Sequence, residues 1–267
     1  MDMFSLKDKT AIVTGACGLL GTQHCAALAE AGAQVIVADL DERPCHELAQ
    51  RLGPIHLGIG LDVTSEHSLQ QARQRILDRY GRIDILVNNA ALNDKFEDPL
   101  LAGEQSMFEH YPLEMWDRSW KVNVSGVFLC SRVFGSVMAE QGGGSIINIA
   151  STYGIVAPDQ DLYRNAAGEQ TFYKSPSYPV TKSAVIGFTK FLASYWGKKQ
   201  VRVNTLSPGG VENSQDEFFI NKYAERTLLH RMATAMDYKG AIVFLASDAS
   251  AYMTGANLVV DGGWTTV

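Results

Sequence analysis

The chain has 267 residues, of which 46% are hydrophobic, and its formal net charge is −6. This length suits one large α/β domain or two small ones, and the apolar fraction is enough for a sizeable core. The negative charge disfavours a nucleic-acid partner, which requires a basic face. The N-terminal sequence MDMFSLKDKT lacks a secretory-signal pattern, and no apolar run has the length required to span a bilayer. We therefore expect a cytoplasmic protein without a membrane partner.

Metal and disulfide chemistry find little support in the residue pattern. The six histidines form no HxxxH or HExxH motif, so we expect no metal site. The four cysteines contain no CxxC pair and are expected to be free thiols in a reducing compartment. They are Cys17, Cys25, Cys45 and Cys130.

Short β-branched runs alternate with longer amphipathic segments along the chain. Strands are expected at 11–13, 34–38, 55–60, 85–87, 145–149, 201–206 and 257–260. Helices are expected at 20–31, 42–52, 66–80, 114–140, 178–197 and 237–247. Because VIVA, DILV and SIIN are near-continuous apolar runs, the strands are predicted to form a parallel sheet with helices on both faces. The chain is therefore predicted to be one α/β domain over 1–267 with a doubly wound sheet.

Three segments interrupt this alternation, and each follows the C-terminal end of a predicted strand. They cover residues 93–111, 152–177 and 212–234. Ligands of open α/β sheets bind at this edge, and long loops there are more often functional than accidental. We expect 152–177 to contain a substrate-binding insertion and 212–234, which follows a Pro-Gly-Gly turn, to form a lid.

The stretch TGACGLLG, residues 14–21, lies between the first predicted strand and the first predicted helix. Gly15 allows a tight turn, small residues at 16–18 let backbone N–H groups approach a pyrophosphate, and Gly21 lets the helix pack closely on the sheet. The helix N-terminus favours an anion. The spacing is unusual for a dinucleotide fingerprint, because Leu19 stands where a glycine is expected. The flanking strand and helix nevertheless favour a phosphate cradle over an ordinary turn.

Asp39 ends the second predicted strand and supplies an acidic residue at the expected place. Its carboxylate would accept hydrogen bonds from the adenosine ribose and repel a 2′-phosphate, and Leu40 supplies no compensating cation. NAD is therefore favoured over NADP, while Arg43 leaves NADP as an alternative. The other interpretation of Asp39 is a turn residue or a helix cap. Asp62 and Val63 would border the adenine, or Asp62 would be a plain residue near the start of the next helix.

The stretch YPVTK places Tyr178 and Lys182 four residues apart on a predicted helix. Residues at this spacing share one face, so both side chains point into the same site. A phenol is a poor base at neutral pH, and a nearby ammonium together with an oxidised nicotinamide lowers its pKa. Tyr178 would then serve as the acid/base that interconverts an alcohol and a ketone. The alternative is an ordinary surface face of a helix.

Taken together, these motifs resemble the short-chain dehydrogenase/reductase family over nearly the whole chain. The stretches that carry the resemblance are TGACGLLG (14–21), Asp39, Asp62-Val63, Asn88-Asn89-Ala90, Asn123 in KVNVSG, Ser151 in INIAS, YPVTK (178–182), PGG (208–210), TG (254–255) and VDGG (260–263). The resemblance implies a single-domain Rossmann fold with a seven-stranded, mostly parallel sheet. It also implies a catalytic tetrad of Asn123, Ser151, Tyr178 and Lys182.

The implied roles agree with the chemistry of these side chains. Ser151 would hydrogen-bond the substrate oxygen, and Lys182 would hold the nicotinamide ribose and tune Tyr178. Asn123 would hold a water, by its backbone or side chain, that links Lys182 to solvent. The cofactor contacts expected in this way are Gly15, Cys17, Gly18, Leu19, Leu20, Gly21, Asp39, Leu40, Asp62, Val63, Asn89, Ala90, Ala91, Tyr178, Lys182, Pro208, Gly209, Gly210, Val211 and Asn213.

Two features depart from the family pattern. The segment 158–177 is an insertion between the catalytic residues Ser151 and Tyr178. Asn213 stands where relatives often carry a threonine that binds the nicotinamide amide. Asparagine both donates and accepts hydrogen bonds, so it is compatible with that contact.

The insertion is rich in hydrogen-bonding side chains, as a sugar or polyol pocket requires. Substrate contacts are expected from Ser151, Tyr153, Tyr163, Arg164 and Tyr173. Arg164, Lys174 or Lys222 would pair with a substrate phosphate. The alternative is a solvated loop surface. Within the family, the long insertion and the DGGWT ending resemble members associated with bacterial surface-sugar biosynthesis.

The leading hypothesis is an NAD-dependent oxidoreductase that acts on the secondary alcohol or ketone of a sugar, polyol or sugar derivative. The alternatives are a 3-ketoacyl-type reductase that uses NADP, a non-redox sugar-nucleotide epimerase or dehydratase, and a non-catalytic Rossmann protein. Asp39 and the polar insertion weigh against the ketoacyl-type reductase, and an intact tetrad weighs against the non-catalytic protein. The apolar helix 178–197 is explained by core burial, whereas the resemblance implies that it joins 114–140 in the dimer interface of a homotetramer, or of a homodimer.

Overall fold

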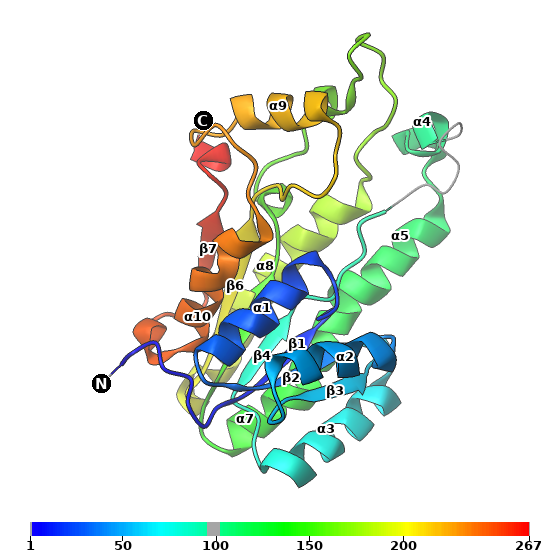
Figure 1. The fold of residues 1–267 in the computed structure, drawn as a ribbon. Helices are drawn as coiled ribbons and strands as arrows, with labels where there is room; N and C mark the ends of the chain where they lie inside the picture. Colours follow the sequence, from blue (N-terminus) through cyan, green and yellow to red (C-terminus); the bar gives the residue numbers. More distant parts are fainter. Residues whose placement is uncertain (1, 95–101, 267) are drawn as a thin grey trace.

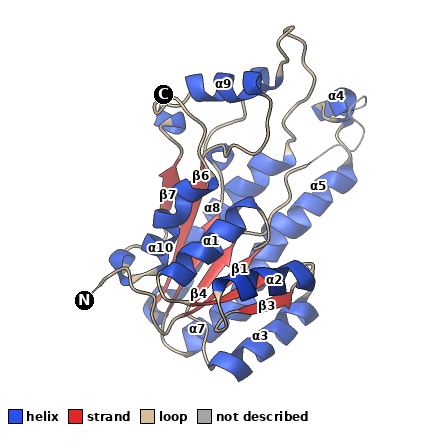
Figure 2. Cartoon of the chain, in the orientation of Figure 1, coloured by secondary structure: helices blue, strands red, loops and turns tan. Residues whose placement is uncertain are grey.

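Seven strands lie side by side in one sheet at the centre of the protein (Figure 1), and they are red in Figure 2. The structure, a computed structural model, describes residues 2–94 and 102–266. The strands are β1 (Thr10–Thr14), β2 (Gln34–Asp39), β3 (Leu57–Gly60), β4 (Ile85–Asn88), β5 (Gly144–Ile149), β6 (Val201–Pro208) and β7 (Asn257–Val260). Their order is β3-β2-β1-β4-β5-β6-β7, and all six neighbouring pairs are parallel. The predicted Rossmann sheet is confirmed, and these strands are wholly rather than mostly parallel.

Successive residues of a central strand face opposite layers of the protein, and both layers are apolar. Ile12 and Ile36 pack in one core cluster, whereas Ala11, Val13 and Val35 pack in the other. Because side chains alternate across a strand, a strand covered on both faces must be apolar at nearly every position. The continuous apolar run VIVA in β2 follows from this burial.

Helices cover both faces of the sheet in a three-layer arrangement (Figure 1). One face carries α1 (Leu19–Glu30), α2 (Glu42–Leu52) and α10 (Lys239–Ala246). The other carries α3 (Glu66–Tyr80), α8 (Ser177–Trp196) and the long helix Leu113–Glu140. The long helix comprises α5 (Leu113–Trp120), η2 (Lys121–Gly126), α6 (Val127–Cys130), η3 (Ser131–Gly135) and α7 (Ser136–Glu140), of which η2 and η3 are π-helical.

The helix Leu113–Glu140 corrects one expectation from the sequence. Its 28 residues include a window of mean hydropathy 1.4, so by length and composition alone it is able to cross a membrane. In this fold 56% of that window is buried inside the protein, where Val133 and Phe134 pack against the sheet. Core burial is therefore a sufficient physical reason for its apolar composition.

One strand boundary and two helices differ from the sequence-based expectation. The third strand was expected from residue 55 but begins at Leu57, because Val35 N–H donates to the ring nitrogen Nδ1 of His56 (3.0 Å) instead of to a strand carbonyl. The segment 212–234 contains a helix, α9 (Glu217–Glu225), which starts where Asp216 accepts a hydrogen bond from Phe219 N–H (3.0 Å). A second short helix, α4 (Ala102–Gln105), lies within 93–111.

The direction of winding reverses between β1 and β4. From β1 the sheet grows through β2 to β3, and from β4 it grows through β5 and β6 to β7. The loops after β1 and β4 therefore diverge and leave a crevice at the C-terminal edge of the sheet. The glycine-rich turn follows β1, and Asn89 follows β4, so both lie at this crevice.

Candidate functional site

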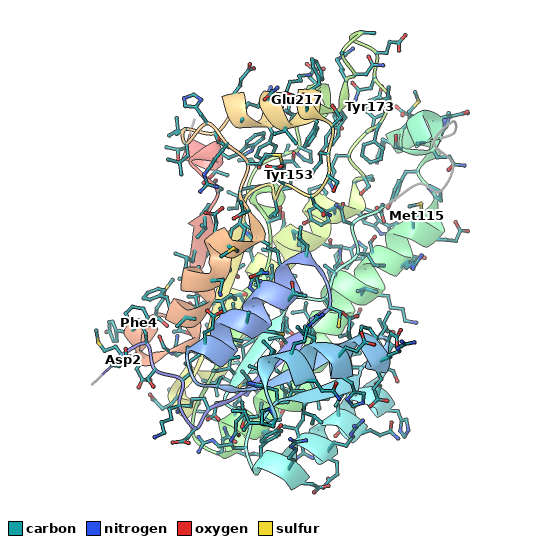
Figure 3. All side chains as sticks on the ribbon, in the orientation of Figure 1. Asp2, Phe4, Met115, Tyr153, Tyr173 and Glu217 are labelled. Carbon is teal, nitrogen blue, oxygen red and sulfur yellow. The ribbon has the colours of Figure 1, made fainter. Side chains whose placement is uncertain are left out.

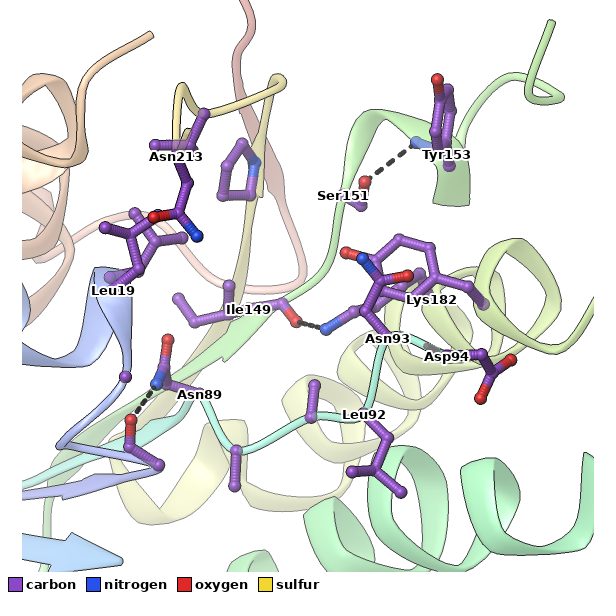
Figure 4. A pocket seen from close by; sticks show the side chains of 18 of the residues that line it. Leu19, Asn89, Leu92, Asn93, Asp94, Ile149, Ser151, Tyr153, Lys182 and Asn213 are labelled. Atoms are coloured by element: carbon purple, nitrogen blue, oxygen red, sulfur yellow. Dashed lines mark hydrogen bonds between the residues drawn. The ribbon is translucent and has the colours of Figure 1, made fainter. Parts of the chain in front are cut away.

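A cavity of about 1090 Å³ lies at the C-terminal edge of the sheet (Figure 4). Its size is at the upper end for small-molecule sites, which suits a dinucleotide with a second ligand beside it. The predicted residues that line it are Gly15, Gly18, Leu19, Leu20, Gly21, Asp39, Leu40, Asp62, Val63, Asn89, Ala90, Ala91, Ser151, Tyr153, Tyr163, Tyr178, Lys182, Pro208, Gly209, Gly210, Val211 and Asn213. The predicted residues Cys17, Asn123, Arg164 and Tyr173 are not part of its lining.

Two of the three glycines in TGACGLLG are required by the backbone. Gly15 has φ +61, and a Cβ there would lie 2.7 Å from Ala90 Cα. A Cβ on Gly21 would lie 2.2 Å from the carbonyl oxygen of Gly15, so α1 could not pack this closely with any other residue. A Cβ on Gly18 would meet Gly15 O at 3.4 Å, an ordinary contact. The tight turn and the close helix packing thus rest on Gly15 and Gly21.

The amides at the start of the turn bond to β2 rather than facing the cavity. Ala16 N–H donates to Ala38 O (3.1 Å), and Cys17 N–H donates to the Asp39 carboxylate (2.9 Å). Both donors are thereby committed within the protein. The expectation that these amides approach a pyrophosphate does not agree with this geometry, because an N–H group that already points at β2 cannot turn toward a ligand.

The donors available for an anion belong to the first turn of α1. Its first intrahelical hydrogen bond runs from Thr22 N–H to Gly18 O (3.1 Å). The N–H groups of Leu19, Leu20 and Gly21 precede that bond and have no acceptor within the helix. All three residues line the cavity. The positive end of the helix dipole therefore faces the crevice through 19–21.

The Asn89 side chain braces the glycine-rich turn. Its amide nitrogen donates to the carbonyl oxygens of Thr14 (3.0 Å) and Gly15 (2.9 Å). Figure 4 marks one hydrogen bond of Asn89 with a dashed line. The Thr14 hydroxyl in turn accepts from the N–H groups of Asn89 and Ala90, both at 3.1 Å. These bonds join the ends of β1 and β4, so Asn89 fixes the cradle by its side chain.

The acidic residues at the far end of the cavity are not helix caps. Asp41, not Asp39, caps α2 by accepting from Arg43 N–H (3.0 Å). Asp39 accepts from the N–H groups of Cys17 and Leu40 and lines the cavity. Asp62 accepts from both the N–H and the hydroxyl of Thr64 at 2.8 Å and also lines it, while α3 is capped by a different residue, Ser65.

Ser151 and Tyr178 meet on the opposite side of the cavity. Ser151 ends the loop after β5, and its Oγ accepts from Tyr153 N–H (3.1 Å; Figure 4). Burial raises the pKa of Tyr178 above its ordinary value, and its hydrogen bond with Ser151 lowers that pKa only in part. In the protein alone, therefore, the phenol is held in its protonated form.

Lys182 lies one helical turn beyond Tyr178 on the same face of α8. Its Nζ donates to Ile149 O (2.8 Å; Figure 4) and lies 5.7 Å from the centroid of the Tyr178 ring. Burial lowers the pKa of Lys182 to about 8. Since both side chains line the cavity, the structure places YxxxK in the site rather than on the outer surface.

Asn123 stands in the π-helical segment η2, and both N–H donors of its side-chain amide are occupied. Its Oδ1 accepts from Leu92 N–H (2.7 Å), and its amide nitrogen donates to Leu92 O (3.0 Å) and Thr181 Oγ1 (3.1 Å). These three bonds hold the loop after β4 against α8. The amide keeps no N–H donor for a water, whereas Oδ1 retains one lone pair, so the water expected at Asn123 would be held through an acceptor, either Oδ1 or the backbone carbonyl.

The lid helix α9 covers the cavity beside the C-terminal end of the chain. The Tyr223 hydroxyl accepts from Gly210 N–H (2.6 Å), and a Cβ on Gly210 would lie 2.5 Å from the Tyr223 ring. Trp264, from the DGGWT ending, stacks on Tyr223 with 4.2 Å between ring centroids. Gly210 is thus a glycine because an aromatic side chain of the lid lies against it.

The lid also rests on the insertion. In Figure 3, Tyr153 lies below α9, the helix that carries Glu217. Arg226 forms an ion pair with Asp159, and Lys222 Nζ donates to Asp161 O (2.6 Å). Within this contact the ring centroids of Tyr163 and Phe219 lie 5.8 Å apart. The two segments that the sequence marks as irregular therefore close over the cavity together.

Some of the predicted substrate contacts in and near the insertion line the cavity, and others do not. Tyr153 and Tyr163 line the cavity, with their hydroxyl oxygens 3.4 Å apart. Arg164 instead pairs with Asp161 (2.8 Å) on the exposed tip, and Tyr173 lines a separate cavity of about 620 Å³ near α4. Lys174 lines the main cavity. The sequence indicated this residue only as one of three cations able to pair with a substrate phosphate.

The residues present fit a dinucleotide. One wall carries the features that phosphates and a ribose require, in the order in which they require them. They are the turn at Gly15, the close helix approach at Gly21, the amides of 19–21 and the carboxylate of Asp39. On the opposite wall Ser151, Tyr178 and Lys182 surround the remaining space.

Comparison with known proteins agrees with this geometry. The family model described as enoyl-(acyl carrier protein) reductase matches residues 15–265. D-threitol dehydrogenase of Mycolicibacterium smegmatis is 35% identical over 270 residues, which cover 98% of this chain and 95% of that protein. The chain belongs to the short-chain dehydrogenase/reductase family. A second family member, 2-dehydro-3-deoxy-D-gluconate 5-dehydrogenase of Escherichia coli, is 33% identical over 273 residues, or 99% of this chain and 98% of that protein.

A solved structure extends the likeness to the fold. The crystal structure of a gluconate 5-dehydrogenase from Burkholderia cenocepacia, in complex with NADP and tartrate, superposes with a TM-score of 0.86 at 30% identity. It covers 100% of this chain and 98% of that one. As a short-chain dehydrogenase/reductase, the protein is an NAD(P)-dependent oxidoreductase that acts on CH–OH groups. The family and the enzyme class predicted from the sequence are confirmed.

Proposed function

We propose that the protein is an NAD-dependent dehydrogenase that interconverts a secondary alcohol and a ketone on a polyhydroxylated substrate. The observation that carries this proposal is the convergence of Ser151, Tyr178 and Lys182 across one cavity from the glycine-rich turn. The relatives named for threitol, 2-dehydro-3-deoxy-D-gluconate and gluconate support a sugar-like substrate.

The chemistry of this site divides between the cofactor and the chain. When bound, the nicotinamide accepts or returns the hydride on the reacting carbon. In oxidation Tyr178 would first lose its own proton to solvent, and its phenolate would then take the proton of the substrate hydroxyl. In reduction the phenol gives that proton back, so no charge builds up on the substrate oxygen. Ser151 donates a hydrogen bond to the same oxygen. Lys182, with a positive charge below pH about 8, stabilises the phenolate that Tyr178 must become.

The electrostatics of the ribose end favour NAD over NADP. Asp39 would lie against the 2′ position, where its charge repels a phosphate, and its neighbour Leu40 is apolar. The nearby cation Arg43 pairs with Glu47 (3.1 Å) on the exposed surface of α2 and is not part of the cavity lining. A 2′-phosphate would therefore meet a carboxylate without a compensating cation.

Replacing Asp39 tests this preference. We expect Asp39→Ala to weaken NAD binding about tenfold, which corresponds to about 1.4 kcal/mol, and to raise the ratio of NADP to NAD use. The measurement is the Kd of each cofactor by fluorescence titration. Asp41→Ala is the matched control, because it removes a neighbouring carboxylate that caps α2 but does not line the cavity. An unchanged cofactor ratio in Asp39→Ala would contradict the assignment.

The reaction itself is tested by a substrate screen. Polyols, sugars, sugar acids and sugar phosphates are incubated with NAD or NADP while the absorbance of the reduced cofactor is followed. We expect turnover with at least one polyhydroxylated compound, and faster turnover with NAD. A substrate that is converted without net cofactor reduction would point instead to an epimerase or dehydratase.

We also propose that α8 and the long helix form a dimer interface within a homo-oligomer. Phe188, Phe191 and Tyr195 make a stacked ladder with ring centroids 6.1 and 6.0 Å apart, and Phe191 and Tyr195 are 60% and 68% exposed. Phe128 of the long helix extends this aromatic face. Such a patch is costly to leave in water. Light scattering of Phe191→Glu should give a smaller mass than the wild type, and an unchanged mass would exclude this face.

A further inference from the structure

The end of the insertion brings a second ammonium to the proposed catalytic tyrosine. Lys174 Nζ lies 4.5 Å from the centroid of the Tyr178 ring, closer than Lys182 Nζ at 5.7 Å. Lys182 is engaged by Ile149 O within the protein, whereas Lys174 lines the part of the cavity beside Asn93. The chemistry assigned to Tyr178 and Lys182 does not require this second cation.

The protein supplies Lys174 with a neutral hydrogen-bond partner and with no ion pair in the described residues, and the charge of Asp94 acts on it only from beyond ion-pair distance. Its Nζ donates to Asn93 Oδ1, and a lysine ammonium carries three donors. Within 2–94 and 102–266, none of the ion pairs includes Lys174. Burial lowers the pKa of Lys174 to about 8, so the ammonium is desolvated yet still charged at neutral pH.

The neighbouring carboxylate is already occupied by other groups. Asp94 accepts hydrogen bonds from the hydroxyls of Tyr111, Ser177 (2.8 Å) and Ser119 (3.2 Å). Figure 4 draws Asn93 and Asp94 next to each other in the lining of the pocket. Asp94 therefore anchors the loop after β4. It also lines the cavity, but three hydroxyl groups share its charge and it forms no ion pair with Lys174.

The backbone of Lys174 is held in place by a dedicated side chain. Gln160 Oε1 accepts from Lys174 N–H (2.8 Å), and Gln160 Nε2 donates to Lys174 O (3.3 Å). Gln170 Nε2 in turn donates to Gln160 O (2.9 Å). Two amide side chains inside the insertion thus fix where its last residues run. A cation held in this way is preorganised for a ligand, since its position does not have to be found on binding.

We propose that Lys174 binds an anionic group of the substrate, so that the enzyme acts on a polyhydroxylated acid in preference to the corresponding neutral polyol. This inference rests on the proposed function and narrows its substrate class. One ammonium matches the single charge of a carboxylate, and a phosphate ester offers the same chemistry with a larger charge. In either case the anion pairs with Lys174 while a hydroxyl of the same molecule reaches Tyr178.

The test separates binding from turnover. In the Tyr178→Phe protein with saturating NAD, calorimetry measures the affinity for D-gluconate, D-glucitol and D-glucitol 6-phosphate. We expect D-gluconate or the phosphate to bind at least tenfold more tightly than D-glucitol. Adding Lys174→Met should remove that advantage, while its effect on D-glucitol stays within about twofold. Lys174→Arg should retain part of the advantage, because it keeps the charge.

Lys198→Met is the matched control, since Lys198 is exposed on the short helix η6 (Gly197–Lys199) and is remote from the cavity lining. It should leave all three affinities unchanged, and the NAD affinity of every variant reports whether the fold is intact. Equal binding of D-glucitol and of both anionic compounds, or equal weakening of all three by Lys174→Met, would overturn the inference. In wild-type protein, oxidation of neutral polyols alone would also overturn it and leave the proposed function standing. Absence of turnover with every compound would instead defeat the proposed function, while the binding comparison still decides the role of Lys174.

Discussion

Tyr178→Phe should lower kcat/KM by roughly 10³-fold, the usual scale for losing a general acid/base. The phenylalanine ring fills the same buried space between Lys174 and Lys182, so the fold and the cofactor site should persist. The measurement is the rate of cofactor reduction with the best substrate of the screen, together with the NAD Kd. The loss should appear in kcat, because the missing proton transfer belongs to the chemical step.

Tyr252→Phe provides the control for this variant, because Tyr252 is fully exposed and removal of its hydroxyl should change the rate by no more than about twofold. If Tyr178→Phe retained a tenth or more of the wild-type rate, Tyr178 would not be the proton-transfer group. A rate lost together with NAD affinity would indicate a structural rather than a chemical contribution.

Gly21→Ala should be the most damaging change in the glycine-rich turn. The added Cβ would lie 2.2 Å from Gly15 O and 2.8 Å from Ala16 Cα, so α1 must move away from the turn. Such overpacking costs about 1–3 kcal/mol of stability. Because the same movement displaces the amides of 19–21, we also expect the NAD Kd to rise about tenfold or more. Thermal unfolding and fluorescence titration measure the two effects.

Gly18→Ala is the matched comparison within the same motif. Gly18 has φ −76, which any residue adopts, and its Cβ would meet only Gly15 O at 3.4 Å. We expect its stability and NAD affinity to stay near those of the wild type. Equal losses of stability and NAD affinity in both variants would contradict the special role assigned to the close helix approach at Gly21.

The comparison of these two glycines shows where sequence patterns lose information. The pattern indicates a phosphate cradle and marks Leu19 as an unusual residue, but it does not say which N–H groups remain available. That depends on contacts with β2, where Ala38 O and the Asp39 carboxylate take the amides of Ala16 and Cys17. Residues distant in the sequence therefore decide which part of the turn faces the ligand.

Asn123 and Lys174 make the same point for the catalytic side. The family motif identifies Asn123, yet only the fold shows that both N–H donors of its amide are used by Leu92 and Thr181. Lys174 belongs to no sequence motif, and its position depends on hydrogen bonds with Gln160, which lies elsewhere in the insertion. Arg164 looked equivalent in the sequence but pairs with Asp161 outside the cavity.

The sequence by itself determined the seven-stranded parallel sheet, the order of its helices and the family, because these follow from local periodicity and from short motifs at the strand ends. Only the tertiary structure decided how the insertion and the lid close over the cavity, through the pair of Asp159 with Arg226 and the stack of Tyr223 on Trp264. Irregular segments carry no periodic signal, and their paths are set by side-chain contacts with partners far along the chain. Lys174, which we propose binds the substrate, lies in one of those segments.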